Sequence, residues 1–170
     1  MTPREKPQHY PQLFRRHERN PILTANDWPY PVHTVFNAGA CQIDGTTLLL
    51  VRAEDRRGHS HLSVARSADG ISGWRIDPQP SFAADPTNYA EEAWGVEDAR
   101  VTWVEDRQEW IIAYTAFSAI GPLVSLASTA DFTSFTRLGP VMPPEDKDAA
   151  IFPRRFGDRY AMIHRPVSAG

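Results

Sequence analysis

The chain has 170 residues, of which 41% are hydrophobic and 23% are charged, an ordinary balance for a soluble globular protein with one substantial core. A formal net charge of −3 gives no overall positive field, which argues against nucleic acid or an anionic membrane as a partner. Cys41 is the only cysteine, so an internal disulfide and a cysteine-based metal cluster are excluded.

Residues 1–31 are rich in proline and charge and are predicted to form an N-terminal arm and lead-in to a β-rich domain over residues 32–170. This start has no apolar core of the signal-peptide type, and no stretch approaches the ~18 apolar residues of a membrane span. We therefore expect a cytoplasmic protein without a membrane partner.

From residue 32 onward, short β-rich runs alternate with turns. Strands are predicted at residues 36–43, 46–52, 62–67 and 74–76, and Asp44-Gly45 and Asp69-Gly70 are the turn signals between them. These four strands form one antiparallel meander.

The same order of strands then recurs. Strands are predicted at residues 99–104, 110–115, 123–129 and 135–138, and a third copy begins with residues 148–152 and 160–165. Asn37 matches Asp98 at a separation of 61 residues, and residues 64–69 match 126–131 at a separation of 62. Four short strands per repeat, without a long amphipathic helix, are typical of a β-propeller blade, and a β-sandwich is the alternative.

The fold class predicted is therefore an all-β propeller, of which about two and a half blades are present. Propellers close by radial repetition, so the open blade edges need a cover. We expect the chain to be the first part of a longer propeller, with pairing between copies, as a homo-oligomer, as the alternative.

Residues 94–100 carry two adjacent carboxylates, Glu97 and Asp98, just before a predicted strand. Because adjacent residues of an extended chain point to opposite faces, only one of the two is expected to face a site. The simpler interpretation is an ion pair between Asp98 and Arg100 that fixes a loop.

The repeat predicts which side chains converge. The start of each innermost strand of a propeller faces the central channel, and Asn37, Asp98 and Asp148 occupy these starts. The matching ends of the returning strands carry other polar side chains: Arg52, Tyr114, His164 and Arg165, with Lys147 beside Asp148. This set suits a polyhydroxylated ligand, either neutral or anionic.

These residues belong to an ordered series of motifs. The series comprises Phe36-Asn37-x-Gly39-Ala40, Arg52, Gly95-x-Glu97-Asp98-x-Arg100, Tyr114-Thr115-Ala116, Lys147-Asp148-Ala149-Ala150-Ile151-Phe152-Pro153 and His164-Arg165-Pro166. It resembles glycoside hydrolase family 130, whose mannoside phosphorylases and β-mannosidases have a five-bladed propeller. The sequence departs from that family's pattern at Ala99, where proline is usual, and at Lys147, where many phosphorylases have arginine.

The resemblance implies inverting phosphorolysis of β-mannosides to mannose 1-phosphate, with Asp98 as the general acid and inorganic phosphate as co-substrate. It implies contacts to the oligosaccharide substrate from Asn37, Arg52, Glu97 and Asp148, and contacts to phosphate from Arg52, Lys147 and Arg165. Neither a metal nor another cofactor is expected. A phosphate nucleophile is already anionic and needs no general base.

Other interpretations stay open. A β-mannoside hydrolase of the same family and a noncatalytic carbohydrate-binding propeller fragment are the alternatives for the whole chain. Asn37 alone is also consistent with a turn cap, Arg52 with a surface pair to Glu54 or Asp55, and Lys147 with a solvated charge cluster. Trp94 adjoins the carboxylate motif and is the tryptophan best placed to contact a sugar.

Overall fold

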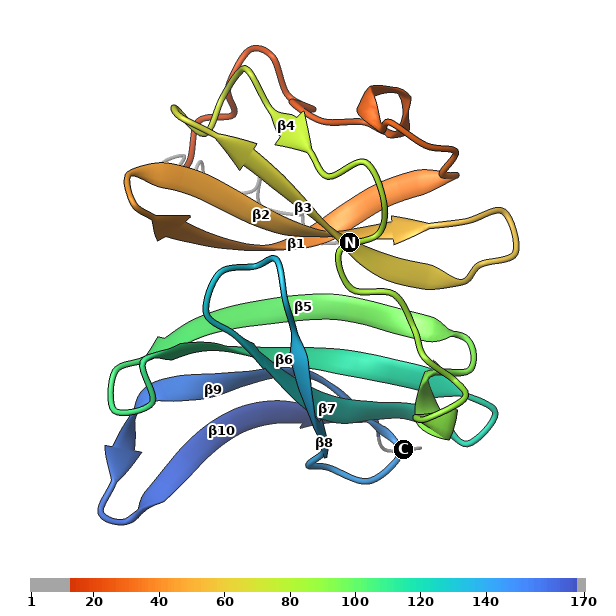
Figure 1. The fold of residues 1–170 in the computed structure, drawn as a ribbon, viewed down its shortest axis with the longest axis vertical. Coiled ribbons are helices and arrows are strands. Elements are labelled where there is room, and N and C mark those ends of the chain that lie inside the picture. The colour runs from red at the N-terminus through yellow and green to blue at the C-terminus, as the bar shows by residue number, and fades with distance from the viewer. Residues whose placement is uncertain (1–12, 168–170) are drawn as a thin grey trace, which may run out of the picture.

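The structure is a computed structural model that describes residues 13–167, drawn in Figure 1. It contains ten strands and two short 3₁₀ helices. The strands are β1 (Thr34–Ile43), β2 (Thr46–Glu54), β3 (Ser60–Ser67), β4 (Arg75–Ile76), β5 (Gly95–Val104), β6 (Glu109–Ser118), β7 (Gly121–Thr129), β8 (Thr136–Pro140), β9 (Asp146–Phe156) and β10 (Arg159–Pro166). The 3₁₀ helices are η1 (Ala25–Asp27) and η2 (Ala90–Glu92).

The strands form two four-stranded antiparallel meanders, β1 to β4 and β5 to β8, followed by the hairpin β9–β10. A single parallel pairing of Ser60 with Gly95 joins the two meanders. Figure 1 shows the first meander above the second, with the hairpin below. The predicted all-β architecture is confirmed, and the number of blades, both in this chain and in the complete propeller, stays a prediction.

Local chemistry explains the repeat. Asp44 and Gly45 both have positive φ, 48° and 74°, as the tight hairpin turn between β1 and β2 requires. In the turn after β3, Asp69 Oδ1 accepts hydrogen bonds from the backbone N–H groups two and three residues later. Asp131 Oδ1 accepts the same two hydrogen bonds in the turn after β7. The 62-residue match thus reflects one turn used twice.

The main hydrophobic core lies between the first two blades. Leu50 and Val64 contribute to it from the first blade, and Val96 and Ile112 contribute from the second. A smaller core fills the space between the second blade and the hairpin β9–β10. The first blade therefore packs against the second through a continuous apolar layer.

The lead-in packs on the first blade. Trp28 is buried against Val51 and Ala65, and Tyr30 packs beside it. The Tyr30 hydroxyl also forms a 2.9 Å hydrogen bond with His61 Nε2 on β3. Residues 1–12 of the predicted arm lie outside the described residues. The boundary between arm and domain at residue 31 stays a prediction.

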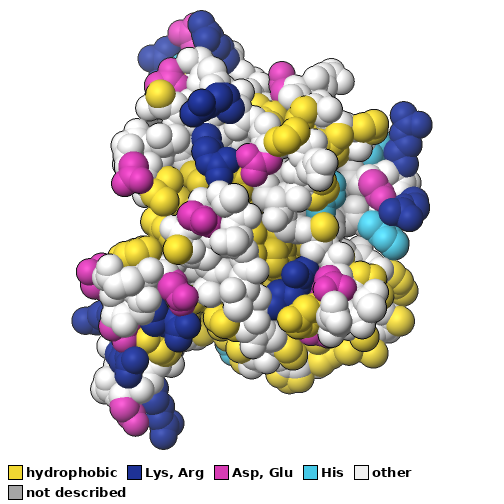
Figure 2. Space-filling view, in the orientation of Figure 1, with side chains coloured by type: hydrophobic (Ala, Val, Ile, Leu, Met, Phe, Trp, Pro, Cys, Tyr) yellow, Lys and Arg dark blue, Asp and Glu magenta, His cyan; other side chains and the backbone are white. Residues whose placement is uncertain are grey.

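The described surface carries mixed charge. Basic and acidic side chains are interspersed over the face shown in Figure 2, as the small net charge leads one to expect. Within residues 13–167, no helix has the length and apolar character needed to cross a membrane.

Candidate active site

The three inner strands share one irregularity. Near the start of β1 and β5, and likewise in β9, the pairing with the neighbouring strand shifts by one residue, which is a β-bulge. The first residues of these bulges are Asn37, Asp98 and Asp148, with φ values of 47°, 52° and 53°. Asparagine and aspartate tolerate this left-handed region better than most residues. The predicted channel positions therefore have the same backbone geometry in all three strands.

The bulge corrects the expectation that only one of the two adjacent carboxylates faces the site. Glu97 and Asp98 both contact Arg52, at 2.9 Å and 3.0 Å. The strict alternation of a flat strand would separate them. Because Asp98 lies inside the bulge and has a positive φ, its side chain turns to the same side as Glu97.

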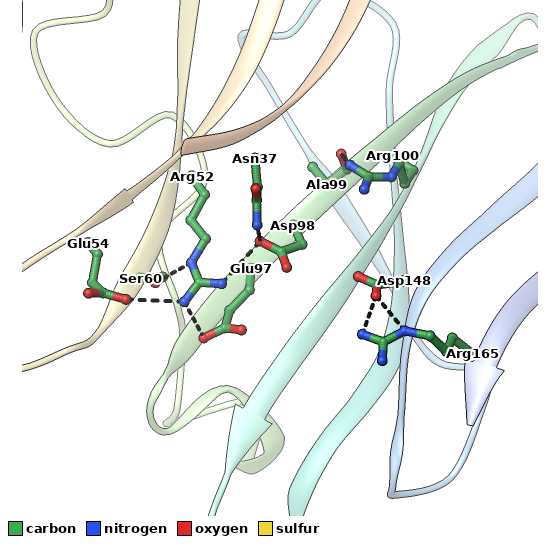
Figure 3. Close-up of polar contacts among 10 residues, drawn as sticks. All are labelled: Asn37, Arg52, Glu54, Ser60, Glu97, Asp98, Ala99, Arg100, Asp148 and Arg165. Atoms are coloured by element: carbon green, nitrogen blue, oxygen red, sulfur yellow. Dashed lines mark hydrogen bonds and ion pairs between the residues drawn. The ribbon is translucent and has the colours of Figure 1, made fainter. Parts of the chain in front are cut away.

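Arg52 is the centre of the group and is only 12% exposed (Figure 3). It donates from Nε to Ser60 Oγ at 2.8 Å, and its terminal nitrogens donate to Glu54, Glu97 and Asp98. Its guanidinium also lies over the Phe36 ring, 4.5 Å from the centroid. The alternative of a surface pair with Glu54 is wrong in one respect, because that pair is part of a larger, mostly buried network.

Asp98 is held from two strands of the first blade. Its Oδ1 accepts a 3.0 Å hydrogen bond from Asn37 Nδ2 on β1 and another of 3.0 Å from Arg52 on β2. The simpler interpretation of an Asp98–Arg100 ion pair does not hold within residues 13–167, where the Arg100 guanidinium contacts the Ala99 carbonyl at 3.5 Å. The candidate acid is thus fixed at the seam between two blades.

The remaining predicted site residues form a separate pair. Asp148 and Arg165 are joined by two hydrogen bonds, one from Arg165 Nε at 2.7 Å. Within the described part of the chain, no hydrogen bond or ion pair connects them to the group around Arg52, and Lys147 forms no ion pair. Lys147 is nevertheless close enough to lower the pKa of Glu97.

The electrostatics of the group around Arg52 are unbalanced, since one guanidinium faces three carboxylates. Burial raises the pKa of Glu97, and the neighbouring Asp98 and Glu54 charges raise it further, while Arg52 and Lys147 oppose them. The group therefore carries excess negative charge, which favours a neutral, hydroxyl-rich ligand over an anion beside Arg52.

Tyr114 lies elsewhere than predicted. The strand register pairs Phe36 with Arg52 and Glu97 with Thr115, so Thr115 is the counterpart of Arg52. Tyr114 is buried and donates a 2.8 Å hydrogen bond to Glu92. The predicted equivalence of Arg52 and Tyr114 is therefore wrong by one residue.

Sequence reasoning missed the residues that support Arg52, namely Ser60 and Phe36. Phe36 precedes Asn37 in its motif, and Ser60 comes directly after the β2–β3 turn, but neither has a chemical signature of its own. His164, one of the polar side chains at the ends of the returning strands, pairs with buried Asp146 at 2.6 Å. Among residues 13–167, no group of three His, Cys, Asp or Glu side chains is arranged to hold a metal ion.

Two surfaces flank the site. A cavity of about 410 Å³ lies beside Asn37, lined mainly by apolar side chains of the lead-in and the first blade. Trp94 is 42% exposed, and its indole packs edge-on against Phe117 with centroids 5.2 Å apart.

Comparison with known proteins extends over nearly the whole chain. The family model of beta-1,4-mannooligosaccharide phosphorylase, glycoside hydrolase family 130, matches residues 6–169. A beta-1,2-mannobiose phosphorylase of Listeria innocua is 28% identical over 89% of this chain and 57% of its own length. A beta-1,4-mannooligosaccharide phosphorylase of Ruminococcus albus is 27% identical over 98% of this chain and 50% of its own. The chain thus spans about half the length of these curated relatives.

Solved structures agree on the fold. The Listeria innocua beta-1,2-mannobiose phosphorylase, in complex with beta-1,2-mannobiose, superposes with a TM-score of 0.78 at 24% identity, over 91% of this chain and 58% of that one. A second solved structure, from the glycoside hydrolases of this family that target beta-1,2 mannosidic linkages in Candida mannan, has a TM-score of 0.69 at 24% identity, over 81% of this chain and 46% of that one. With the family model covering nearly every residue and the propeller architecture in agreement, the chain belongs to glycoside hydrolase family 130.

Proposed function

We propose that this chain carries the general acid of an inverting β-mannoside phosphorylase. The observation that supports the proposal most directly is the position of Asp98, which Asn37 and Arg52 hold at the seam of two blades. Its side chain is 13% exposed, so it is partly shielded while remaining open to a substrate. Membership in a family named for mannooligosaccharide phosphorolysis supplies the substrate class.

The proposed reaction needs one acid and one anionic nucleophile. Asp98 gives its proton to the glycosidic oxygen, through a sugar hydroxyl or directly, as the bond from that oxygen to the anomeric carbon breaks. A phosphate oxygen forms the new bond to the anomeric carbon from the opposite face. The products are mannose 1-phosphate and the shortened oligosaccharide.

Two cations suit the phosphate better than Arg52 does. Arg52 already faces three carboxylates, whereas Lys147 forms no ion pair within residues 13–167. Arg165 is 57% exposed and pairs with a single carboxylate, Asp148. We therefore assign phosphate binding to Lys147 and Arg165, and contact with the sugar to Glu97 and Asp148.

The test uses the intact protein with β-1,4-mannobiose, and in parallel with β-1,2-mannobiose, in the presence and absence of phosphate. Mannose 1-phosphate that forms only with phosphate is the expected result. Binding of the sugars by calorimetry without any turnover would support a noncatalytic carbohydrate-binding propeller. A protein that shows neither sugar binding nor turnover would overturn the proposal.

A hydrolase is the second candidate, favoured by the carboxylates Glu54 and Glu97 beside Asp98. Inverting hydrolases use a second carboxylate to activate water, at ~6.5–9.5 Å from the acid. Mannose release that does not depend on phosphate would identify this branch.

A further inference from the structure

We propose that Arg52 and Asn37 are positioning residues that bind Asp98 through Oδ1 and thereby assign the catalytic proton to Oδ2. The inference rests on the proposed role of Asp98 as general acid. It replaces the expectation that Arg52 is a phosphate ligand.

The two carboxylate oxygens of Asp98 have different surroundings. Oδ1 accepts hydrogen bonds from Asn37 Nδ2 and from Arg52, each 3.0 Å long. A proton on Oδ1 would point at donors that have no free lone pair to accept it. Oδ2 makes no hydrogen bond to any residue in the range 13–167, and Figure 3 shows it pointing away from both donors. The proton therefore resides on Oδ2, where a sugar hydroxyl or glycosidic oxygen can take it.

The Arg52 side chain is held rigidly by its contacts. A guanidinium has five N–H donors, and four of those in Arg52 are used, by Ser60, Glu54, Glu97 and Asp98. The ring of Phe36 covers one face of the guanidinium. A side chain held at this many points orients what it contacts, because few of its rotamers remain accessible.

The surroundings of Arg52 argue against phosphate binding by this residue. A phosphate beside Arg52 would meet three carboxylates around one guanidinium, and displacing one of them would leave a buried charge unpaired. Arg52 is thus suited to orient the acid and poorly suited to bind the nucleophile.

The experiment compares two substrates in the intact protein. Natural β-mannobiose needs a proton on its leaving group, whereas 2,4-dinitrophenyl β-mannoside has a leaving group that departs without one. For Arg52→Met, we expect kcat on mannobiose to fall by about 10²-fold or more, since general acids contribute 10²–10⁴-fold. We expect kcat on the aryl mannoside, and the KM for phosphate, to change little.

Four further variants make the comparison specific. Asn37→Ala should show the same substrate-dependent loss, and the double variant should lose less than the product of the single losses, because both residues act on one carboxylate. Arg165→Met should instead raise the KM for phosphate. Arg107→Met, on a distant exposed turn where Arg107 pairs with Glu109, should match the wild type.

Two results would contradict the positioning role of Arg52. A raised phosphate KM in Arg52→Met, or equal losses on both substrates with circular dichroism showing a folded protein, would overturn the inference. If Arg52→Met does not fold, Arg52→Lys provides the same comparison with the charge retained. Wild-type turnover without phosphate would reject the phosphorylase proposal but leave the substrate comparison valid, and a wild type inactive on both substrates would reject both.

Discussion

Glu97 is a residue whose charge the fold disfavours. Burial raises the pKa of its carboxyl group, with added effects from Asp98 and Glu54. The folded protein thus binds this proton more tightly than the unfolded chain, whose carboxyl group titrates near its ordinary pKa of 4.5. Stability falls as the pH rises through the range between the two pKa values, so ionised Glu97 lowers the free energy of unfolding at neutral pH.

Glu97→Gln should therefore raise the melting temperature at pH 7. The gain over wild type should shrink toward pH 4, where the wild-type carboxyl is mostly protonated in both states. Thermal unfolding at both pH values measures the difference, and Glu109→Gln, at a partly exposed strand end where Glu109 pairs with Arg107, is the control. A lower melting temperature of Glu97→Gln at pH 7 would mean that attraction to Arg52 outweighs burial.

Among the elements, the segment between β4 and β5 is anchored by a buried ion pair. Glu92 in η2 is fully buried, and both its oxygens accept hydrogen bonds from Arg137 on β8, each 2.9 Å long. Tyr114 donates to the same carboxylate. This network holds the segment that leads into the Glu97-Asp98 motif.

Arg137→Met should destabilise the protein by about 3–5 kcal/mol, because it leaves the buried Glu92 charge without its partner. Urea unfolding measures the loss. The double variant Glu92→Gln/Arg137→Met should recover part of it, since no buried charge then remains. Equal instability of the single and double variants would show that packing of Arg137 over Phe82 and Tyr89, not charge, is decisive.

Gly39 sets the distance between the inner strands of the first two blades. A Cβ at this position would lie 2.7 Å from the Ala99 carbonyl oxygen on β5. Gly39→Ala should therefore push β1 from β5, with an overpacking penalty of about 1–3 kcal/mol and a lower kcat, because Asn37 moves with β1. Unfolding and turnover are measured beside Ala40→Ser, an exposed neighbour; full activity of Gly39→Ala would show that the seam can widen harmlessly.

The sequence predicts the elements better than their mutual register. Strands and turns follow from local signals such as Asp44-Gly45, and the repeat identifies Asn37 and Asp98 as equivalent. The bulge at Asp98 is a property of two paired strands, so it is invisible in one strand and the shared orientation of Glu97 and Asp98 is missed. The burial of Glu92 is missed for the same reason, because its partner Arg137 lies 45 residues away.

At the scale of the molecule, the site lies on an interface between blades that is also the main core. Leu50 faces the second blade and is fully buried, whereas its neighbour Leu49 faces the other way, toward the lead-in. Alternation along β2 thus gives one leucine to the shared core and the next to the first blade's own packing. In repeat proteins stability is the sum of such blade and interface contributions.

Leu50→Ala should cost about 2–5 kcal/mol and weaken both blades together, because its cavity opens between them. Hydrogen exchange should show reduced protection in β2 and β6 alike. Leu49→Ala, the matched control on the opposite face, should reduce protection in the first blade alone. If Leu50→Ala loosened only β1 to β3, the blades would unfold independently. The Asn37–Asp98 contact would then need support other than the core beneath it.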